Sequence, residues 1–237
     1  MIAVLPAAGK GTRMSAVASG SKELLTVGGR SILEWVLREA AEAGAGEQIV
    51  VVSPAKSDLL ALPGLTTALQ EKATGLAPAL LAANRLEPTL LLLPDTIFFP
   101  RSPSVRLVKA LSQGYDIAIA VQPVAEQAVS RYGIVEWSRE NGRIARILEK
   151  PQPSQTASRW AIAARFALSP RTLLFCKQRV AQLEDGNKEV DLPPLLSEAI
   201  AAGHAALAIP LEADEQRLDC GNPEGYRHAC EVVDASR

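Results

Sequence analysis

The chain has 237 residues, 48% of them hydrophobic, and a formal net charge of −1 at pH 7. A chain of this length can bury a substantial core within one domain. The near-neutral charge argues against a basic nucleic-acid binder and against a disordered acidic chain, so we expect no nucleic-acid partner.

Short β-rich runs alternate with helical patterns in the first half of the chain, which is the order that builds parallel βαβ units. Ser31 is a candidate N-cap of the first helix, and Gly44 is a candidate stop signal. The predicted strands cover residues 2–5, 48–52 and 89–93, and the predicted helices cover residues 32–41, 75–84 and 105–111. Because the apolar start is too short for a signal peptide or a membrane span, we expect a cytoplasmic protein without a membrane partner.

From residue 116 onward, strands separated by turn signals indicate more antiparallel pairing. Asn141-Gly142 predicts a hairpin turn, and Asn222 predicts the N-cap of a closing helix. The predicted strands cover residues 117–121, 133–137, 143–148 and 204–209, and the predicted helices cover residues 170–183, 192–202 and 223–233. The expected fold class is α/β, with a Rossmann-like three-layer α/β/α arrangement, a mixed and mostly parallel sheet, and a smaller antiparallel lobe.

Cysteine and histidine give little support to other chemistries. The three cysteines, Cys176, Cys220 and Cys230, are odd in number and lack C-x-x-C spacing, so neither a disulfide framework nor a structural zinc site is predicted. The two histidines, His204 and His228, do not lie near a serine or cysteine in a nucleophile-like setting. A catalytic triad is therefore not predicted.

A loop of small residues, with the sequence LPAAGKGTRM, leaves the first predicted strand. Its glycines let backbone N–H groups approach an anion, and Arg13 supplies a guanidinium that matches phosphate oxygens. The loop has neither the Walker A pattern nor the dinucleotide fingerprint, so a dinucleotide-dependent oxidoreductase is not predicted. The candidate nucleotide-binding residues in this loop are Ala7, Ala8, Gly9, Gly11, Thr12 and Arg13.

Two aspartates are candidate metal ligands. Asp95 directly follows an apolar strand, and in a doubly wound sheet the carboxyl ends of the strands face the ligand. Asp219 lies just before the closing helix. Read singly, each could be an ordinary turn or cap-adjacent residue, but together with the phosphate loop they predict a Mg²⁺ site, because this ion binds one or two carboxylates and completes its shell with phosphates and water.

The loop and the following Ser21-Lys22-Glu23 segment resemble the sugar-nucleotide pyrophosphorylases, the family of glucose-1-phosphate uridylyltransferases and thymidylyltransferases. The resemblance continues in family order over nearly the whole chain. QEKATGLA at 70–77 is similar to the base-recognition loop, and LPDTIF at 93–98 to the magnesium-binding turn. RYGIVE at 131–136 and EKP at 149–151 are similar to the sugar-binding segments, residues 161–168 to a strand of the uridylyltransferases, and DCGN at 219–222 to the second metal motif.

The resemblance implies that a nucleoside monophosphate is transferred from a triphosphate to a sugar 1-phosphate. It places both substrate sites in one domain, residues 1–237, with a nucleotide-binding half up to about residue 115 and a sugar-binding half after it. The implied catalytic residues are Arg13, Lys22, Asp95 and Lys150. The base would contact Gln70 and Gly75, the sugar would contact Gly133, Glu149 and Lys150, and Mg²⁺ would bind Asp95 and Asp219.

Uracil and thymine differ by one methyl group, which discriminates by only about 1–3 kcal/mol, so Gln70 suits either base. UTP is the first choice because residues 161–168 and Asp219-Cys220-Gly221 are closer to the uridylyltransferases, and glucose 1-phosphate is the sugar by analogy. One alternative is a cytidylyltransferase that acts on an alcohol phosphate, and another is a non-catalytic sensor of nucleotide sugars.

The chain also departs from the family pattern. Ser21 replaces the usual proline before the lysine, and Gly29-Arg30-Ser31 replaces a second Lys-Pro. Ala164 stands where the uridylyltransferases commonly have glycine. The chain is shorter than typical members in segments that often form oligomer contacts, so a homo-oligomer is an open expectation.

Overall fold

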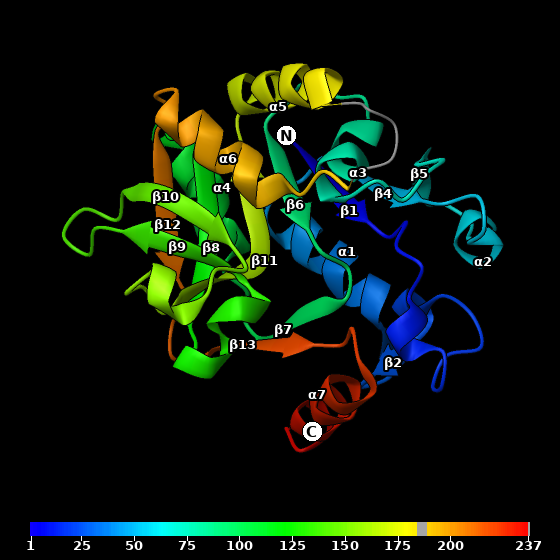
Figure 1. Cartoon of the computed structure of the whole chain (residues 1–237). Coiled ribbons are helices and arrows are strands. Elements are labelled where there is room, and N and C mark those ends of the chain that lie inside the picture. The colour runs from blue at the N-terminus through cyan, green and yellow to red at the C-terminus, as the bar shows by residue number, and fades with distance from the viewer. Residues whose placement is uncertain (184–188, 237) are drawn as a thin grey trace.

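A computed structural model of the chain describes residues 1–183 and 189–236. A nine-stranded mixed sheet forms its centre (Figure 1). The strands of this sheet are β1 (Ile2–Pro6), β4 (Glu47–Val52), β5 (Thr66–Leu69), β6 (Thr89–Leu92), β8 (Ile117–Pro123), β9 (Gly133–Trp137), β10 (Ile144–Glu149), β11 (Trp160–Leu168) and β12 (Ala206–Pro210).

The sheet combines a parallel part with an antiparallel part. Along the order β10-β9-β11-β6-β1-β4-β5, the strands from β6 to β5 are parallel, while β11 runs antiparallel to β6. Beside this path, β8 pairs with β11, and β12 lies parallel to β8. The antiparallel strands β9 and β10 therefore extend the central sheet instead of forming a separate one, and strands from both halves of the chain belong to it.

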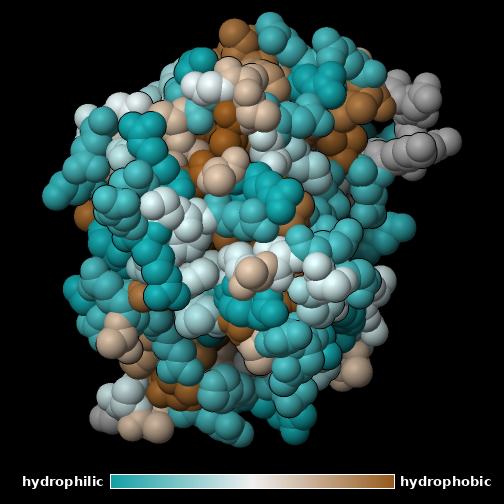
Figure 2. Space-filling view, turned by 60° about the vertical axis from the view of Figure 1, so that its left-hand side comes forward, coloured by the Kyte–Doolittle hydropathy of each residue, from teal (hydrophilic) through white to brown (hydrophobic). Residues whose placement is uncertain are grey.

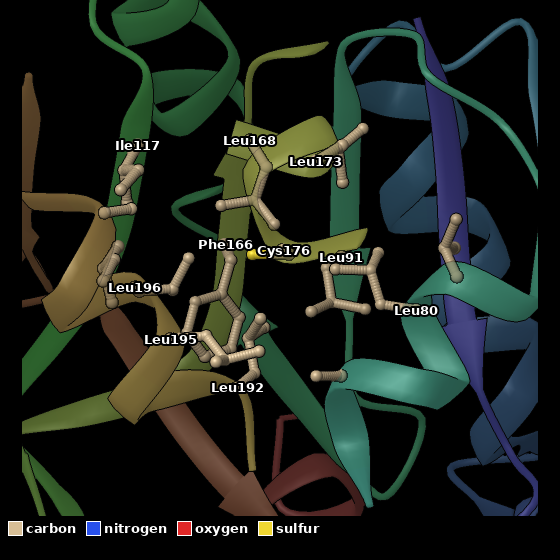
Figure 3. Packing of buried hydrophobic residues seen from close by; sticks show 14 of the residues in the cluster. Leu80, Leu91, Ile117, Phe166, Leu168, Leu173, Cys176, Leu192, Leu195 and Leu196 are labelled. Carbon is tan, nitrogen blue, oxygen red and sulfur yellow. The ribbon is translucent and has the colours of Figure 1, made fainter. Parts of the chain in front are cut away.

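Helices cover both faces of this sheet, as the continuous apolar strands require. The helices are α1 (Ile32–Glu42), α2 (Ser57–Leu60), α3 (Leu76–Ala82), α4 (Ser104–Ser112), α5 (Pro170–Leu183), α6 (Leu192–Ala201) and α7 (Pro223–Asp234). Ile2 and Val4 of β1 pack into the core under α3, α5 and α6, while Ala3 and Leu5 face the core under α1 and α4. Figure 3 shows the first of these cores, where Phe166 and Leu91 of the sheet meet Leu80, Leu173 and Leu195 of the helices. The predicted three-layer α/β fold is confirmed.

The predicted helix caps are present. The Ser31 side chain accepts a hydrogen bond from Glu34 N, and the Glu34 carboxylate accepts one from Ser31 N, which together form a capping box. Gly44 follows α1 with φ of 87°, the left-handed conformation that commonly ends a helix. The Asn222 side chain accepts a hydrogen bond from Gly225 N at the start of α7.

A second, two-stranded sheet was not predicted. It pairs β7 (Thr96–Pro100) with β13 (Glu215–Asp219) in antiparallel register, with Asp219 opposite Thr96. The strand predicted at residues 204–209 is therefore not the last one, and it begins at Ala206. The stretch between β4 and α3 contains α2 and β5, for which the sequence analysis predicts no helix or strand. The remaining short elements are β2 (Thr26–Val27), β3 (Arg30–Ser31) and the 3₁₀ helices Thr12–Met14, Lys22–Leu24, Glu126–Arg131 and Pro153–Gln155.

Ala164 lies at an irregularity in β11. The pairing of β11 with β8 shifts between Ile162 and Phe166, and Ala164 has φ of 60°. Glycine adopts this conformation without strain, which accounts for the glycine that the resembled enzymes commonly carry there.

Hydrophilic residues cover most of the face shown in Figure 2, and the hydrophobic residues on it form separate groups. Within the described part of the chain, no helix is both long and apolar enough to cross a membrane.

Candidate active site

The carboxyl ends of four parallel strands define the candidate site. Because β1, β4, β5 and β6 run in the same direction, the residues that follow them gather at one edge of the sheet. The glycine loop follows β1, Ser53 follows β4, Gln70 follows β5, and Asp95 follows β6 after a short turn. This edge therefore collects most of the predicted nucleotide-binding residues.

The glycine loop passes from the core to the surface within a few residues. Ala7 and Ala8 are buried, and Ala7 N donates a hydrogen bond of 2.7 Å to Val51 O on the neighbouring strand. Gly11 has φ of 64°, which favours glycine, and it precedes the exposed Thr12 and Arg13. The loop borders a cavity of about 590 Å³. Gly9 of the loop lines this cavity together with Lys22, Ser53, Lys56 and Asp58.

The segment around Lys22 is fixed from both sides. Ser21, which replaces the family's proline, donates from its N and Oγ atoms to the Asp58 carboxylate at 2.6 and 2.7 Å. On the other side of Lys22, Glu23 is buried and forms an ion pair of 2.7 Å with Lys56 Nζ. These contacts hold the backbone on either side of Lys22, so its position does not depend on a proline.

Lys22, Asp95 and Asp219 meet at the centre of the site. Lys22 Nζ lies 2.7 Å from Asp95 Oδ2. A Cβ atom placed on Gly221 would lie 3.1 Å from both Asp95 Oδ2 and Asp219 Oδ1, so the two carboxylates face the same glycine. Burial raises the pKa of Asp95, but the Lys22 ammonium and the positive charge of Arg217 outweigh burial and hold that pKa below its ordinary value. Asp95 is therefore a carboxylate at neutral pH.

Gln70 and Gly75 line a second pocket, of about 380 Å³, together with Ala8 and Gly9. Gln70 is buried, and its Nε2 donates to Gly75 O at 3.2 Å. Gly75 has φ of 110°, and a Cβ there would come within 2.5 Å of Val190 O. The pocket is thus formed by the loop after β1 and the loop that leads into α3.

Gly133, Glu149 and Lys150 form a second polar group at the ends of β9 and β10. Glu149 pairs with Gly133, and a Cβ on Gly133 would approach Glu149 Oε2 to 3.1 Å. Lys150 Nζ lies 3.0 Å from Glu149 Oε1, and Lys150 N donates to Tyr132 O. The hydrogen bond to Glu149 raises the pKa of Lys150, and the negative charges of Asp191 and Glu189 add to this effect.

Similarity to known proteins establishes the family of this chain. The protein-family model described as nucleotidyl transferase matches residues 2–235. The chain belongs to this family. A UTP–glucose-1-phosphate uridylyltransferase of Staphylococcus saprophyticus is 27% identical to it, over 94% of this chain and 88% of that protein.

Solved structures agree with the family. A UTP-bound UGPase from Acinetobacter baumannii is 26% identical, with a TM-score of 0.81 over 100% of this chain and 95% of that one. A UDP-glucose pyrophosphorylase complexed with UDP-glucose, 23% identical, has the same fold, with a TM-score of 0.84 over 100% of both chains. The resemblance seen in the sequence is confirmed, and neither the cytidylyltransferase nor the sensor alternative is favoured.

In this nucleotidyl transferase the predicted residues fall into distinct groups. Lys22 contacts Asp95 beside Asp219, and Gln70 contacts Gly75. Gly133 of β9 pairs with Glu149 of β10. Arg13 is exposed on the 3₁₀ helix of the loop. The roles assigned to these residues from the sequence stay predictions.

Arg165 and Glu39, which sequence reasoning missed, hold the turn that carries Asp95. Arg165 is fully buried and forms a two-pronged ion pair with Glu39, through hydrogen bonds of 2.8 and 2.7 Å. Its remaining N–H groups donate to Leu93 O, Thr96 O and Ala164 O. Because Leu93 and Thr96 bracket Pro94-Asp95, the nucleotidyl transferase anchors this turn from inside its core.

Arg217 is the other residue that the sequence did not single out. It lies on β13 two residues before Asp219, and its Nη2 donates to Asp219 Oδ2 at 3.1 Å. Alternate residues of a strand share a face, so this neighbour could have been found if β13 had been recognised as a strand.

Proposed function

We propose that this nucleotidyl transferase transfers UMP from UTP to glucose 1-phosphate, giving UDP-glucose and pyrophosphate. The observation that carries the proposal is the cluster of Lys22, Asp95 and Asp219 at the carboxyl edge of the sheet. The choice of UTP and glucose 1-phosphate is supported by the names of the similar proteins from Staphylococcus and Acinetobacter.

The reaction requires no enzyme nucleophile. A phosphate oxygen of the sugar 1-phosphate attacks the α-phosphorus of UTP, a new P–O bond forms, and the bond from the α-phosphorus to the pyrophosphate oxygen breaks. Two polyanions must be brought together, and charge that develops around the α-phosphate must be stabilised. Lys22 would supply positive charge at the reacting phosphates, and Arg13 with the backbone of the glycine loop would hold the triphosphate.

Asp95 and Asp219 suit a Mg²⁺ ion. Both are carboxylates, the ligand type that this hard cation takes from proteins, and Gly221 between them has no side chain that would fill the space. When bound, Mg²⁺ would neutralise phosphate charge during the displacement. Because Lys22 contacts Asp95 Oδ2, a cation bound to this oxygen would compete with the ion pair and free the ammonium group for the phosphates.

Two further sets of residues would select the substrates. The Gln70 and Gly75 pocket would take the uracil base, with the Gln70 amide facing its edge. Glu149 would accept hydrogen bonds from sugar hydroxyls, Gly133 would offer its backbone, and Lys150 would bind the sugar phosphate. A cytoplasmic location is part of the proposal, since all three cysteines are free thiols and suit a reducing compartment.

The test measures pyrophosphate release from each nucleoside triphosphate, including dTTP, against several sugar 1-phosphates, with Mg²⁺ and with EDTA. The expected result is one preferred pair, UTP with glucose 1-phosphate, active only with Mg²⁺. Asp95→Asn and Lys22→Ala should each lower turnover at least about 100-fold, because each removes a charge that stabilises the transition state.

Asp214→Asn is the matched control, because Asp214 forms an exposed ion pair with Arg101 at the other end of the β7–β13 sheet. This variant should retain normal turnover. Three results would contradict the proposal. They are release of pyrophosphate in EDTA, near-normal rates in Asp95→Asn, and no detectable activity of the folded wild-type protein with any of the substrates.

A further inference from the structure

Arg217 lies beside the proposed metal ligands with most of its hydrogen-bonding capacity unused. Its side chain is only 11% exposed. Within the described part of the chain its guanidinium makes one hydrogen bond, from Nη2 to Asp219 Oδ2, and the enclosed Nε has no acceptor. A guanidinium carries five N–H donors, and burying donors without acceptors is costly.

A comparison within the same molecule indicates that Arg217 is more than a structural arginine. Arg165, also enclosed, satisfies its guanidinium with five hydrogen bonds, to Glu39 and to three carbonyl oxygens. Among the described residues, Arg217 donates a hydrogen bond only to Asp219. A buried polar group that lacks partners calls for an explanation, and an absent anionic ligand is one.

The location of Arg217 suggests which ligand this is. Its Cζ lies 5.6 Å from the centre of the Tyr132 ring, and Tyr132 O accepts a hydrogen bond from Lys150 N. Arg217 also contacts Asp219, which faces Asp95 across Gly221. The guanidinium therefore contacts both Asp219 and Tyr132, the residue whose backbone binds Lys150, and it does not line the pocket of Gln70 and Gly75.

We propose that Arg217 binds the phosphate group of the sugar 1-phosphate, through the N–H groups that do not contact Asp219. A planar guanidinium offers two parallel donors to phosphate oxygens, so one edge can hold Asp219 while another holds the ligand. Arg217 would thus place the acceptor phosphate next to the proposed metal ligands, with Lys150 on the opposite side of the phosphate. This inference rests on the proposed function and adds a substrate-binding residue to it.

The test is steady-state kinetics of Arg217→Gln and Arg217→Lys. Glucose 1-phosphate is varied at saturating UTP and Mg²⁺, and UTP is then varied at the highest practical glucose 1-phosphate. Loss of a charged hydrogen bond should raise the KM for glucose 1-phosphate about 10- to 100-fold in Arg217→Gln, while the KM for UTP changes less than about threefold. Arg217→Lys should show a smaller rise, because lysine keeps the charge and loses the planar fork.

Arg101→Gln serves as the control, since Arg101 is exposed and pairs with Glu212 and Asp214 outside the site. It should change neither KM. A cooperative thermal unfolding transition establishes that each variant is folded. If Arg217→Gln does not fold, Arg217→Lys alone provides the test.

Two outcomes would overturn the inference. An unchanged KM for glucose 1-phosphate in both variants is one. The other is a change confined to the Mg²⁺ concentration needed for half-maximal rate, which would make Arg217 a counterion that only positions Asp219. A wild-type protein that turns over no sugar 1-phosphate would instead refute the proposed function, and the inference with it.

Discussion

Gly75 occupies a backbone conformation that other residues do not adopt. Its φ and ψ are 110° and 177°, a region essentially restricted to glycine. Hydrogen bonds join the residues on either side of it to Val190, from Val190 N to Thr74 O and from Ala77 N to Val190 O. Gly75 is therefore held in close contact with Val190, and its carbonyl in turn holds the Gln70 amide.

Gly75→Ala should raise the KM for the triphosphate and destabilise the fold. The new Cβ would lie 2.5 Å from Val190 O, so the loop must shift and carry the Gln70 contact with it. Gly44→Ala is the control, because Gly44 also has positive φ but has nothing within 4 Å of its Cβ position. We expect Gly44→Ala to cost about 1–2 kcal/mol of unfolding free energy and Gly75→Ala to cost about 1–3 kcal/mol more. Urea unfolding and initial rates measure both effects. An unchanged KM for the triphosphate in Gly75→Ala would show that this loop does not contribute to nucleotide binding.

At the scale of elements, the Glu39–Arg165 pair joins helix α1 to the β6–β7 turn. Glu39 is 8% exposed, Arg165 is fully buried, and the Ser104 hydroxyl from α4 donates to the same carboxylate. Three elements thus meet at one buried carboxylate. Such a pair adds little net stability when it is intact, but removal of one partner leaves an uncompensated buried charge.

Glu39→Gln should therefore destabilise the protein by about 3–5 kcal/mol, whereas the double variant Glu39→Leu with Arg165→Met should recover most of that loss. Turnover of the double variant should stay low, because Leu93 O and Thr96 O lose the donors that anchor the Asp95 turn. Glu42→Gln, on the exposed side of α1, should cost less than about 0.5 kcal/mol. Denaturant unfolding and pyrophosphate release separate the two effects, and normal turnover in a stable double variant would refute the anchoring role.

The sequence predicted the elements that carry their own local signals. The capped helix after Ser31 and the strand before Asp95 have clear periodicity and boundaries, and the motifs at the strand ends lead to Lys22, Asp95 and Gln70. The β7–β13 pair was missed because β13, with the sequence EQRLD, is mostly polar and gains its partner only from a distant part of the chain. Glu39 and Arg165 are 126 residues apart, so no local pattern connects them.

At the scale of the whole molecule, both halves of the chain build one site. β6 and β1 come from the first half, β11 and β9 come from the second, and all four lie side by side in the central sheet (Figure 1). Asp219 reaches Asp95 because β13 pairs with β7 directly after the β6 turn. The residues proposed to bind the acceptor and those proposed to bind the nucleotide thus belong to one central sheet, which suits a reaction that depends on placing two phosphates in line.

The stability of the whole fold should depend on pH through His204, which contacts Thr172 and Phe175 of α5 near the start of β8. His204 is buried, and its Nδ1 lies 2.9 Å from Thr172 Oγ1. Burial lowers the pKa of His204, and the positive charge of Arg171 lowers it further, against the opposing effect of Asp116. The folded state therefore keeps this ring neutral at pH values where the unfolded chain, with an ordinary pKa of about 6.5, takes up a proton.

Stability from neutral His204 is fully present above pH 6.5 and is lost as the pH falls from there through the lower folded pKa, because the unfolded state binds more protons in that interval. Asp116 beside it has a lowered pKa, since hydrogen bonds from Ala205 N and Ser169 outweigh the effect of burial, so its own contribution is lost only at more acidic pH. We expect the free energy of unfolding to fall between pH 7.5 and about 5.5, and this fall to be smaller in His204→Gln. His228→Gln, at the exposed second histidine, should keep the wild-type slope. Urea unfolding at several pH values measures all three proteins, and equal slopes for the wild type and His204→Gln would show that another group controls this dependence.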